Sequence, residues 1–296
     1  MEISSACMLC LMGKQKDVIS NCSDEKKKQD YLKKAFFRFS QAGPDDCAPV
    51  LHADLNKIAK ETFENVKSYQ EEKDHYNQLM LAILPEIEKK IRNSKDPLEA
   101  AIKYARAGNY IDFGAVAEVK EDQLFIILEQ ATEEELSPDT YTALKEELSK
   151  ASQFVYVTDN CGEVVMDMAL IKLLKELYPK LMIQVLVRGC EAINDATIED
   201  AKFIGLTKVS KVIGNGSDVP GTALQRISTE ALQILEKADL IFAKGQGNFE
   251  SLYGAQKGYT VYYLFLCKCD YFTEKFGLKK FSGVFMREQQ TKTEIE

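Results

Sequence analysis

The chain lacks the cationic excess that binders of nucleic acid or anionic membranes need. It carries 38 Lys and Arg residues against 46 Asp and Glu residues, a net charge of -8 at pH 7. Binding to a polyanionic surface depends on a surplus of Lys and Arg. We therefore expect neither a nucleic-acid nor a membrane partner, although a local basic pocket is compatible with this balance.

Long apolar runs are missing as well. No run approaches the roughly 20 residues that cross a bilayer, and the first 14 residues lack the long apolar core of a signal peptide. Hydrophobic residues nevertheless make up 45% of the 296 positions, enough for the core of one large domain or two ordinary ones. We expect a soluble, cytoplasmic protein.

Histidine is scarce. The two histidines, His52 and His75, lie in helical stretches among charged residues, and neither has a Ser or Cys partner at a meaningful spacing. A histidine-based catalytic triad is therefore not expected. We predict that both histidines lie at the surface.

Cysteine is present eight times, but a disulfide framework belongs to short secreted domains, so reduced thiols are expected. Cys7 and Cys10 form a CxxC, and Cys267 and Cys269 are separated by one lysine. A tetrahedral zinc site needs four ligands, and no second CxxC or His pair supplies them. Two interpretations stay open: a structural zinc site if other cysteines converge on the CxxC, or reduced, partly buried thiols.

The spacing of apolar residues differs between the two halves of the chain. Apolar residues recur at three and four spacing from 24 to 149, as at Leu55, Ile58 and Ala59, which predicts helices. We accordingly assign residues 1–150 to a mainly helical region and 151–296 to an α/β domain. Five prolines are expected at helix starts or in loops: Pro44, Pro49, Pro85, Pro97 and Pro138.

Short apolar runs alternate with helical segments in the second half, which predicts a mainly parallel sheet covered on both faces. The expected strands are 154–158, 182–188, 208–214, 239–245 and 259–267. The expected helices are 163–177, 196–205 and 222–238, with a glycine-bearing loop after 245 and a solvated tail from Arg287.

Polar residues follow the first two of these strands. Asp159 and Asn160 come directly after one strand, and Asp195 lies just beyond the next. The carboxyl ends of strands in open α/β sheets are where ligands bind. Two carboxylates and an amide oxygen suit Mg²⁺, Mn²⁺ or a similar ion, although Asp and Asn in such positions also cap helices and form turns.

Lys244 ends the strand 239–245 and opens the segment Lys-Gly-Gln-Gly-Asn. A lysine followed by two glycines suits a phosphate cradle, and a tight turn is the alternative. Arg188 ends the strand 182–188 and is either a second phosphate contact or a partner for a nearby acid. Gly108 and Asn109 interrupt a helix and are typical of a C-cap.

Six segments together resemble a known family: CMLCLMGKQ, GNYIDFG, DNCGE, RGCEAINDAT, GNGSDVPGT and KGQGNFESL. They resemble the metal-dependent damage-control phosphatases, first grouped as domain of unknown function 89. The resemblance runs from Cys7 to about Cys269. The CxxC and the GNYID segment are most similar to the mainly prokaryotic branch of that family.

The resemblance implies a helical N-terminal region packed on a Rossmann-like, mainly parallel three-layer α/β/α domain. It places a divalent ion (Mg, Mn, Co or Ni) on Asp159, Asn160 and Asp195, and a phosphate on Lys244. The remaining matched positions, implied to lie near the substrate, are Glu163, Arg188, Asn248, Glu250, Asn109 and Asp112. Where relatives often have Asp-Pro-Tyr this chain has Asp74-His75-Tyr76, so the resemblance implies no role there.

The implied activity is metal-dependent hydrolysis of small phosphorylated metabolites, either sugar phosphates or damaged and surplus cofactor intermediates, by in-line attack on phosphorus. The attacking group is water or Asp159. Two alternatives stay open: an S-adenosylmethionine-dependent carboxyl methyltransferase and a non-catalytic metabolite-binding protein. The native metal, the physiological substrate and the oligomeric state are not specified by the sequence.

Overall fold

The described residues before the first strand are mainly helical, as the three-and-four spacing predicts. The structure is a computed structural model that describes residues 1–64, 66–110, 121–255 and 260–289. The bounds of the N-terminal helices are Ser5–Ser20 (α1), Glu25–Ser40 (α2), Ala48–Thr62 (α3), Gln70–Asn93 (α4), Pro97–Ala107 (α5), Gly108–Tyr110 (the 3-10 helix η1), Glu121–Thr132 (α6) and Pro138–Leu148 (α7).

Prolines lie in the first turn of three of these helices, Pro49 in α3, Pro97 in α5 and Pro138 in α7. Pro97 and Pro138 follow Asp96 and Ser137, whose side chains accept hydrogen bonds from backbone N–H groups of the first turn. The same prediction is wrong for Pro85, which lies inside α4. Leu84 and Ile87 on either side of it are buried, so packing holds the helix together across the missing hydrogen bond.

A six-stranded sheet in the order β3-β2-β1-β4-β5-β6 forms the centre of the second half. The first five strands are parallel, and β6 is antiparallel to β5. Their bounds are Gln153–Val157 (β1), Met182–Val187 (β2), Lys211–Gly214 (β3), Leu240–Lys244 (β4), Thr260–Leu266 (β5) and Gly283–Gln289 (β6). The sheet confirms the predicted α/β class.

The antiparallel strand β6 is not among the predicted elements. The expectation of a solvated tail is wrong for Arg287, which pairs with Tyr262 across the ladder and forms an ion pair with Glu147 of α7. The segment 283–289 carries Arg and Glu among its apolar residues, because an edge strand is only half covered.

The remaining helices differ from prediction mainly at their starts. Their bounds are Glu163–Leu177 (α8), Ile198–Phe203 (α9), Leu206–Val209 (α10), Thr229–Glu236 (α11), Gln246–Leu252 (α12) and Asp270–Phe276 (α13). The predicted helix 222–238 begins only at α11, where Ser228 caps the first turn. The predicted glycine loop after Gly245 is instead helix α12.

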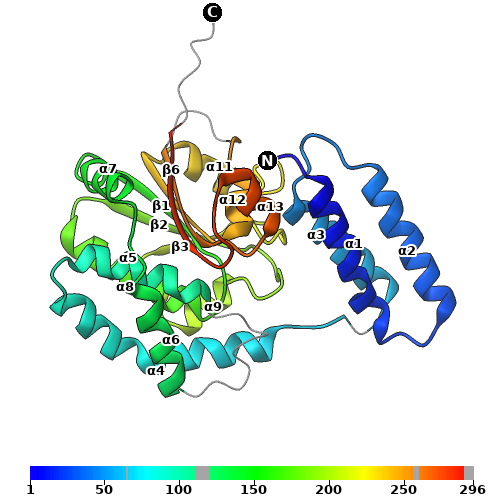
Figure 1. Ribbon diagram of the computed structural model, residues 1–296, viewed down its shortest axis with the longest axis horizontal. Helices are drawn as coiled ribbons and strands as arrows, with labels where there is room; N and C mark the ends of the chain where they lie inside the picture. The colour runs from blue at the N-terminus through cyan, green and yellow to red at the C-terminus, as the bar shows by residue number, and fades with distance from the viewer. Residues whose placement is uncertain (65, 111–120, 256–259, 290–296) are drawn as a thin grey trace, which may run out of the picture.

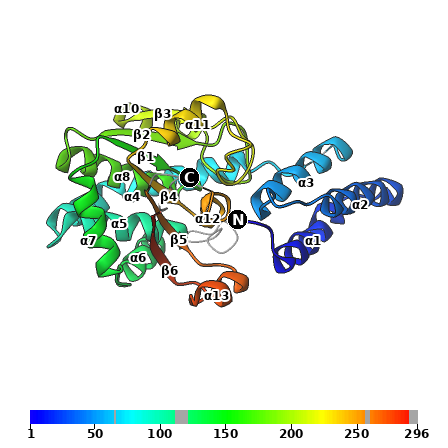
Figure 2. The ribbon, with the colours of Figure 1, turned by 90° about the horizontal axis from the view of Figure 1, so that it is seen from above.

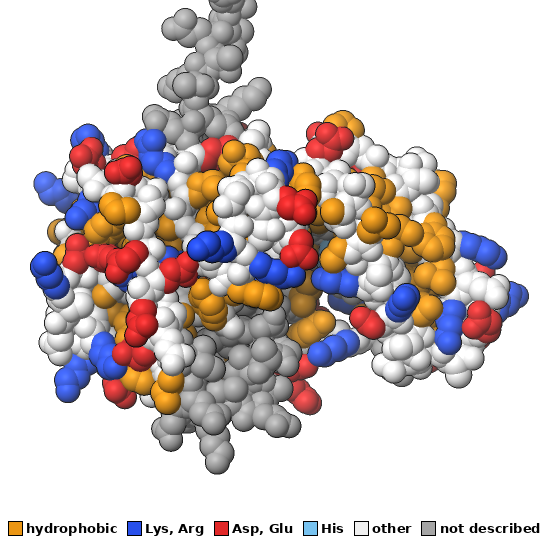
Figure 3. All heavy atoms as spheres, in the orientation of Figure 1, with side chains coloured by type: hydrophobic (Ala, Val, Ile, Leu, Met, Phe, Trp, Pro, Cys, Tyr) orange, Lys and Arg blue, Asp and Glu red, His pale blue; other side chains and the backbone are white. Residues whose placement is uncertain are grey.

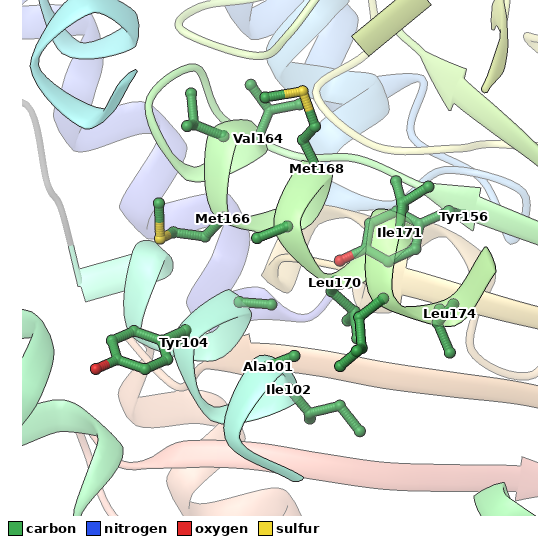
Figure 4. Packing of buried hydrophobic residues seen from close by; sticks show 14 of the residues in the cluster. Ala101, Ile102, Tyr104, Tyr156, Val164, Met166, Met168, Leu170, Ile171 and Leu174 are labelled. Atoms are coloured by element: carbon green, nitrogen blue, oxygen red, sulfur yellow. The ribbon is translucent and has the colours of Figure 1, made fainter. Parts of the chain in front are cut away.

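Alternating residues of the strands form two cores, one on each face of the sheet. Phe154 and Tyr156 belong to the core under α4 to α9, whereas Val155 and Val157 belong to the core under α11 to α13. Figures 1 and 2 show the helices on both faces, which makes the domain three-layered. Figure 4 shows Tyr156 of β1 beside Ile171 of α8.

Helices α1 to α3 form a lobe of their own beside the sheet domain (Figure 1). The lobe has a separate core that includes Tyr31 and Leu51, and an ion pair of 2.7 Å joins Asp54 of α3 to Arg226. On the face in Figure 3, acidic and basic side chains are interspersed and apolar side chains gather over this lobe.

The described helices include none that is long and apolar enough to cross a bilayer. All eight cysteines are free, as expected for reduced thiols. Within the described ranges, no three His, Cys, Asp or Glu side chains are arranged to hold a metal ion, so the zinc interpretation of the CxxC gains no support. The cytoplasmic location stays a prediction.

Candidate functional site

The three predicted metal ligands lie together at the carboxyl ends of β1 and β2. Asn160 and Asp195 pair as an isolated β-bridge, and the Ala196 N–H donates to the Asp159 carbonyl at 2.8 Å. In the strand order, β1 lies between β2 and β4. The chain adds β2 and β3 on one side of β1, and β4 and β5 on the other. Open α/β folds bind ligands at such a switch point.

The Asn160 amide is oriented by two acids. Its Nδ2 donates to Asp159 Oδ2 at 2.8 Å and to Glu163 Oε2 at 3.2 Å. An amide with its NH₂ group held in this way presents its oxygen in another direction. Asn160 Oδ1 is therefore available to a cation.

Arg188 lies between the two carboxylates. Its Nε donates to Asp195 Oδ2 at 2.5 Å and its Nη1 to Thr222 Oγ1 at 3.2 Å. Its Nη2 is 3.9 Å from Asp159 Oδ1 and, among the described residues, makes no hydrogen bond although it is buried. Buried N–H groups are rarely left unpaired, so this group indicates a ligand position in front of it.

Lys244 is fully buried, and its hydrogen bonds go to Glu163, Asp167 and the backbone rather than to the predicted metal ligands. Its ammonium donates to Glu163 Oε1 at 2.6 Å, to Asp167 Oδ1 at 2.7 Å and to the Ala105 carbonyl at 2.8 Å. An ammonium has three N–H donors, and all three are used. The two acids hold the pKa of Lys244 at about 12 against the opposing effect of burial.

Asn109 reaches the site from η1. Its Nδ2 donates to Asp159 Oδ2 at 3.2 Å and to Glu163 Oε2 at 2.7 Å, and its Oδ1 accepts the Leu266 N–H at 3.0 Å. One amide thus joins the helical region to the ends of β1 and β5. The other predicted residue of that motif, Asp112, lies outside the described residues.

Within the described residues, the hydrogen bonds of Asn248 and Glu250 are made to other parts of the protein and not to Asp159 or Asp195. Asn248 donates to the carbonyls of Thr158 and Lys244 and accepts from Thr222, so the fold uses its amide. Glu250 is half-buried and accepts a hydrogen bond from Gln246 at 2.7 Å. The structure assigns both residues contacts that support the turn after β4.

The site carries excess negative charge. Burial, together with the charges of Asp195 and Glu163, raises the pKa of Asp159 well above its ordinary value. Burial also raises the pKa of Asp195 and brings that of Asp167 to about 6. Carboxylates gathered in this way become easier to ionise when a cation binds between them.

The donor set fits a hard divalent ion. Within the described part of the chain, Asp159 Oδ1, Asn160 Oδ1 and Asp195 Oδ1 accept no hydrogen bond; the contact at Asp159 Oδ1 is the ion pair of 3.9 Å with Arg188. Oxygen donors of this kind are preferred by Mg²⁺ and Mn²⁺.

A close approach fixes the turn after β4. Gly245 has φ +80, and a Cβ atom at that position would lie 2.0 Å from Asp159 Oδ2. Only glycine fits, because both the dihedral angle and the space exclude a side chain. The predicted tight-turn role of this glycine therefore brings backbone directly against the carboxylate.

Lys268 is a residue that the sequence analysis missed. It follows β5 at the same edge of the sheet, and its positive charge offsets a small part of the rise that burial, Asp195 and Glu163 cause in the pKa of Asp159. Its side chain is partly exposed, and its ammonium donates no hydrogen bond within the described ranges. Its position in the sequence could have indicated it, since Lys268 directly follows the predicted strand 259–267.

Asp167 was missed as well. It lies one helical turn after Glu163 on α8, and its Oδ1 also accepts the Tyr156 hydroxyl at 2.7 Å. The i, i+4 spacing of two acids on one helix face could have revealed the pair.

A cavity of about 410 Å³ lies apart from this cluster, between the helical lobe and the loop before Asp195. His52, Tyr31 and Glu191 are among its lining residues. The surface prediction holds for His75 but is wrong for His52, which is half-buried. Burial lowers the pKa of His52 to about 4, and the nearby Lys14 acts in the same direction.

Comparison with known proteins decides the family. Residues 3–284 match the damage-control phosphatase ARMT1-like domain. The chain belongs to this family. A crystal structure of a domain-of-unknown-function-89 protein from Pyrococcus horikoshii has the same fold, with a TM-score of 0.85 and 26% identity over 98% of this chain and 100% of that one.

Relatives in the family include two with assigned names. A damage-control phosphatase of Pyrococcus horikoshii is 36% identical over 66% of this chain and 67% of its own length. A damage-control phosphatase of Archaeoglobus fulgidus is 30% identical over 91% of this chain and 93% of its own. An uncharacterized protein of Methanocaldococcus jannaschii is 31% identical over 97% and 95%. The predicted family membership is confirmed.

Proposed function

We propose that this protein is a metal-dependent phosphatase acting on small phosphorylated metabolites. The observation that carries the proposal is that, within the described residues, one oxygen each of Asp159, Asn160 and Asp195 accepts no hydrogen bond and the buried Arg188 Nη2 donates none. Nη2 lies 3.9 Å from Asp159 Oδ1. Oxygen donors for a cation next to N–H donors for an anion suit a phosphate ester. The family match and the names of two relatives support the same reaction.

Asp159, Asn160 and Asp195 would hold the cation. When bound there, a divalent ion (Mg, Mn, Co or Ni) supplies Lewis-acid stabilisation of the charge that develops during phosphoryl transfer. Asn109 and Glu163 hold Asp159 and Asn160 in place through the hydrogen bonds at Asn109 Nδ2 and Asn160 Nδ2. The ligands are thus oriented before any substrate arrives, which is how positioning lowers a barrier.

Arg188 and Lys268 are the cations we assign to the phosphoryl group. Arg188 contributes the buried Nη2, fixed by its bonds to Asp195 and Thr222. Lys268 contributes a partly exposed ammonium whose charge already acts on Asp159. Water then attacks phosphorus in line with the leaving oxygen, and the two cations offset the charge on the equatorial oxygens.

Lys244 has a different task in this proposal. The sequence predicts that it contacts phosphate, but its three donors are bonded to protein acceptors. Contact with phosphate would first require the release of one of them. We assign Lys244 to the neutralisation of Glu163 and Asp167, which keeps Glu163 ionised as an acceptor for Asn109 and Asn160.

A phosphate-release screen tests the proposal. The protein is stripped with a chelator, returned to Mg²⁺, Mn²⁺, Co²⁺ or Ni²⁺ in turn, and assayed on sugar phosphates and phosphopantetheine derivatives. We expect inorganic phosphate only when metal is restored. Labelled methyl transfer from S-adenosylmethionine would instead indicate the methyltransferase, and thermal stabilisation by metabolites without turnover a binding protein. The family match favours neither alternative.

A further inference from the structure

Helix α4 buries two polar side chains one turn apart. Lys73 and Asn77 are 1% and 0% exposed, and their i, i+4 spacing puts them on one face of the helix. A buried ammonium and a buried amide are costly unless they are paired. The Lys73 ammonium and the Asn77 amide oxygen are each bonded to a different loop of the candidate site, whereas the Asn77 Nδ2 makes no hydrogen bond within the described residues.

Asn77 holds the loop after β1. Its Oδ1 accepts the Gly162 N–H at 2.7 Å. Gly162 has φ +78 and ψ -59, a rare γ-turn conformation, and a Cβ atom there would lie 3.1 Å from Tyr76 Cβ. This strained residue separates Asn160 from Glu163, so the hydrogen bond from α4 fixes the turn that aims both side chains.

Lys73 holds the loop after β2. Its Nζ lies 2.7 Å from Asp200 Oδ2, and Asp200 is 2% exposed. The same oxygen accepts the N–H of Thr197 at 2.8 Å and its hydroxyl at 2.6 Å, which caps α9. Thr197 is two residues beyond Asp195. The ammonium therefore balances the acid that anchors the Asp195 loop.

We propose that Lys73 and Asn77 are positioning residues that clamp the Asp159–Glu163 and Asp195–Thr197 loops to one rigid helix, and so set the spacing of the cation ligands. The ligand roles of Asp159, Asn160 and Asp195 rest on the proposed function. The clamp itself does not, because both loops contact α4 whatever the site binds. Outer groups of this kind usually change metal affinity or activity by about 10- to 100-fold when removed.

The first experiment needs no metal and no substrate. Hydrogen exchange of the chelated protein is followed in peptides covering 158–165, in wild type, Asn77→Ala and Ile87→Ala. Ile87 is a buried α4 residue away from both loops, so it matches the loss of core packing. We expect exchange at 158–165 to rise at least tenfold in Asn77→Ala alone. Equal protection in Asn77→Ala and wild type would overturn the clamp.

The second experiment measures the affinity for Mn²⁺ by calorimetry and its activation constant for phosphate release. Asn77→Ala is expected to weaken both about 10- to 100-fold, and Ile87→Ala less than twofold. Asn77→Asp, which keeps the acceptor oxygen one turn from Lys73, is expected to restore both to within about threefold of wild type. Equal losses in Asn77→Ala and Ile87→Ala would reduce Asn77 to an ordinary core residue.

The two proposals fail differently. Wild-type protein that neither binds Mn²⁺ nor releases phosphate would end the proposed function, and hydrogen exchange alone would then decide the clamp. Lys73→Met, followed at 193–199, gives a second variant if Asn77→Ala does not fold. Its exchange is expected to rise at 193–199, and unchanged exchange there would remove Lys73 from the clamp.

Discussion

Lys244 and Asp167 form an ion pair of 2.7 Å in which neither side chain is exposed to solvent. The same ammonium pairs with Glu163 at 2.6 Å. Two acids on successive turns of α8 thus share one lysine from the end of β4. This relationship ties the charge balance of the candidate site to the packing of the helix on the sheet.

Replacing Lys244 with Met should lower stability first of all. The change leaves two buried carboxylates without their cation, and breaking a buried pair in this way costs about 3–5 kcal/mol. Urea unfolding of the chelated protein measures the loss. Lys172→Met is the matched control, since Lys172 of α8 pairs with Glu88 of α4, both about one-third exposed, and this pair should contribute at most about 1 kcal/mol. Similar losses in the two variants would contradict this assignment.

Lys268→Ala should affect substrate and spare the fold. Its ammonium has no hydrogen bond to give up in the described structure, and a charged contact to phosphate is worth about 1.5–3 kcal/mol. We expect KM for a phosphorylated substrate to rise about 10- to 100-fold with an unchanged melting temperature. Steady-state kinetics at saturating metal check this. Lys211→Ala, at the opposite edge of the sheet, should leave KM unchanged.

Gly245→Ala should disable the site by steric conflict. The new methyl group would have to occupy the space of the Asp159 carboxylate, in a backbone conformation that L-residues avoid. Phosphate release should fall by at least about 100-fold, as is typical when a reacting group is displaced by about 1 Å. Gly254→Ala is the control, since it shares a positive φ but has open space around it. Comparable activity in the two variants would show that the approach to Asp159 is unimportant.

The sheet was predictable because the central strands β1 and β4 are buried on both faces. The runs around Val155 and Ile241 are continuously apolar, so they can be recognised in a single sequence without an alignment. Helix α12 was not predictable, because Gly245 and Gly247 flank its start and glycine disfavours helices. Tertiary packing of Phe249 on the aromatic residues of β5 overrides that local preference.

The site was predictable in part. Asp159, Asn160 and Asp195 follow strands, so their convergence is fixed by the parallel topology alone. The sequence could not show that all three N–H groups of Lys244 are bonded to protein acceptors. Asp167 and the Ala105 carbonyl come from segments that only the folded chain brings to it. A lysine at a strand end looks the same in sequence whether it faces a ligand or two buried acids.

Glu250 should make stability depend on pH. Burial raises its pKa from 4.5 to about 7. The folded state then binds this proton more tightly than the unfolded state, so the stabilisation is complete below about pH 4.5 and is lost as pH rises through about 7. In Glu250→Gln this dependence disappears. The free energy of unfolding of wild type relative to the variant should fall between pH 5 and 8.

The size of that fall is bounded by the shift in pKa, which corresponds to about 3 kcal/mol. Residual exposure of the side chain makes this an upper bound. Urea unfolding at pH 5, 6, 7 and 8 on chelated protein gives the four differences. A constant difference across this range would show that Glu250 titrates normally in the folded protein.

Metal titration of phosphate release by wild type and Asp159→Asn, side by side, tests the central claim most directly. Asp159 is crowded by Asp195 and Glu163, so the neutral amide should keep or raise the stability of the chelated protein while removing a ligand oxygen's charge. We predict saturable activation of wild type by the divalent ion and no metal-dependent release by the folded variant. Full metal-dependent turnover by Asp159→Asn would contradict the account.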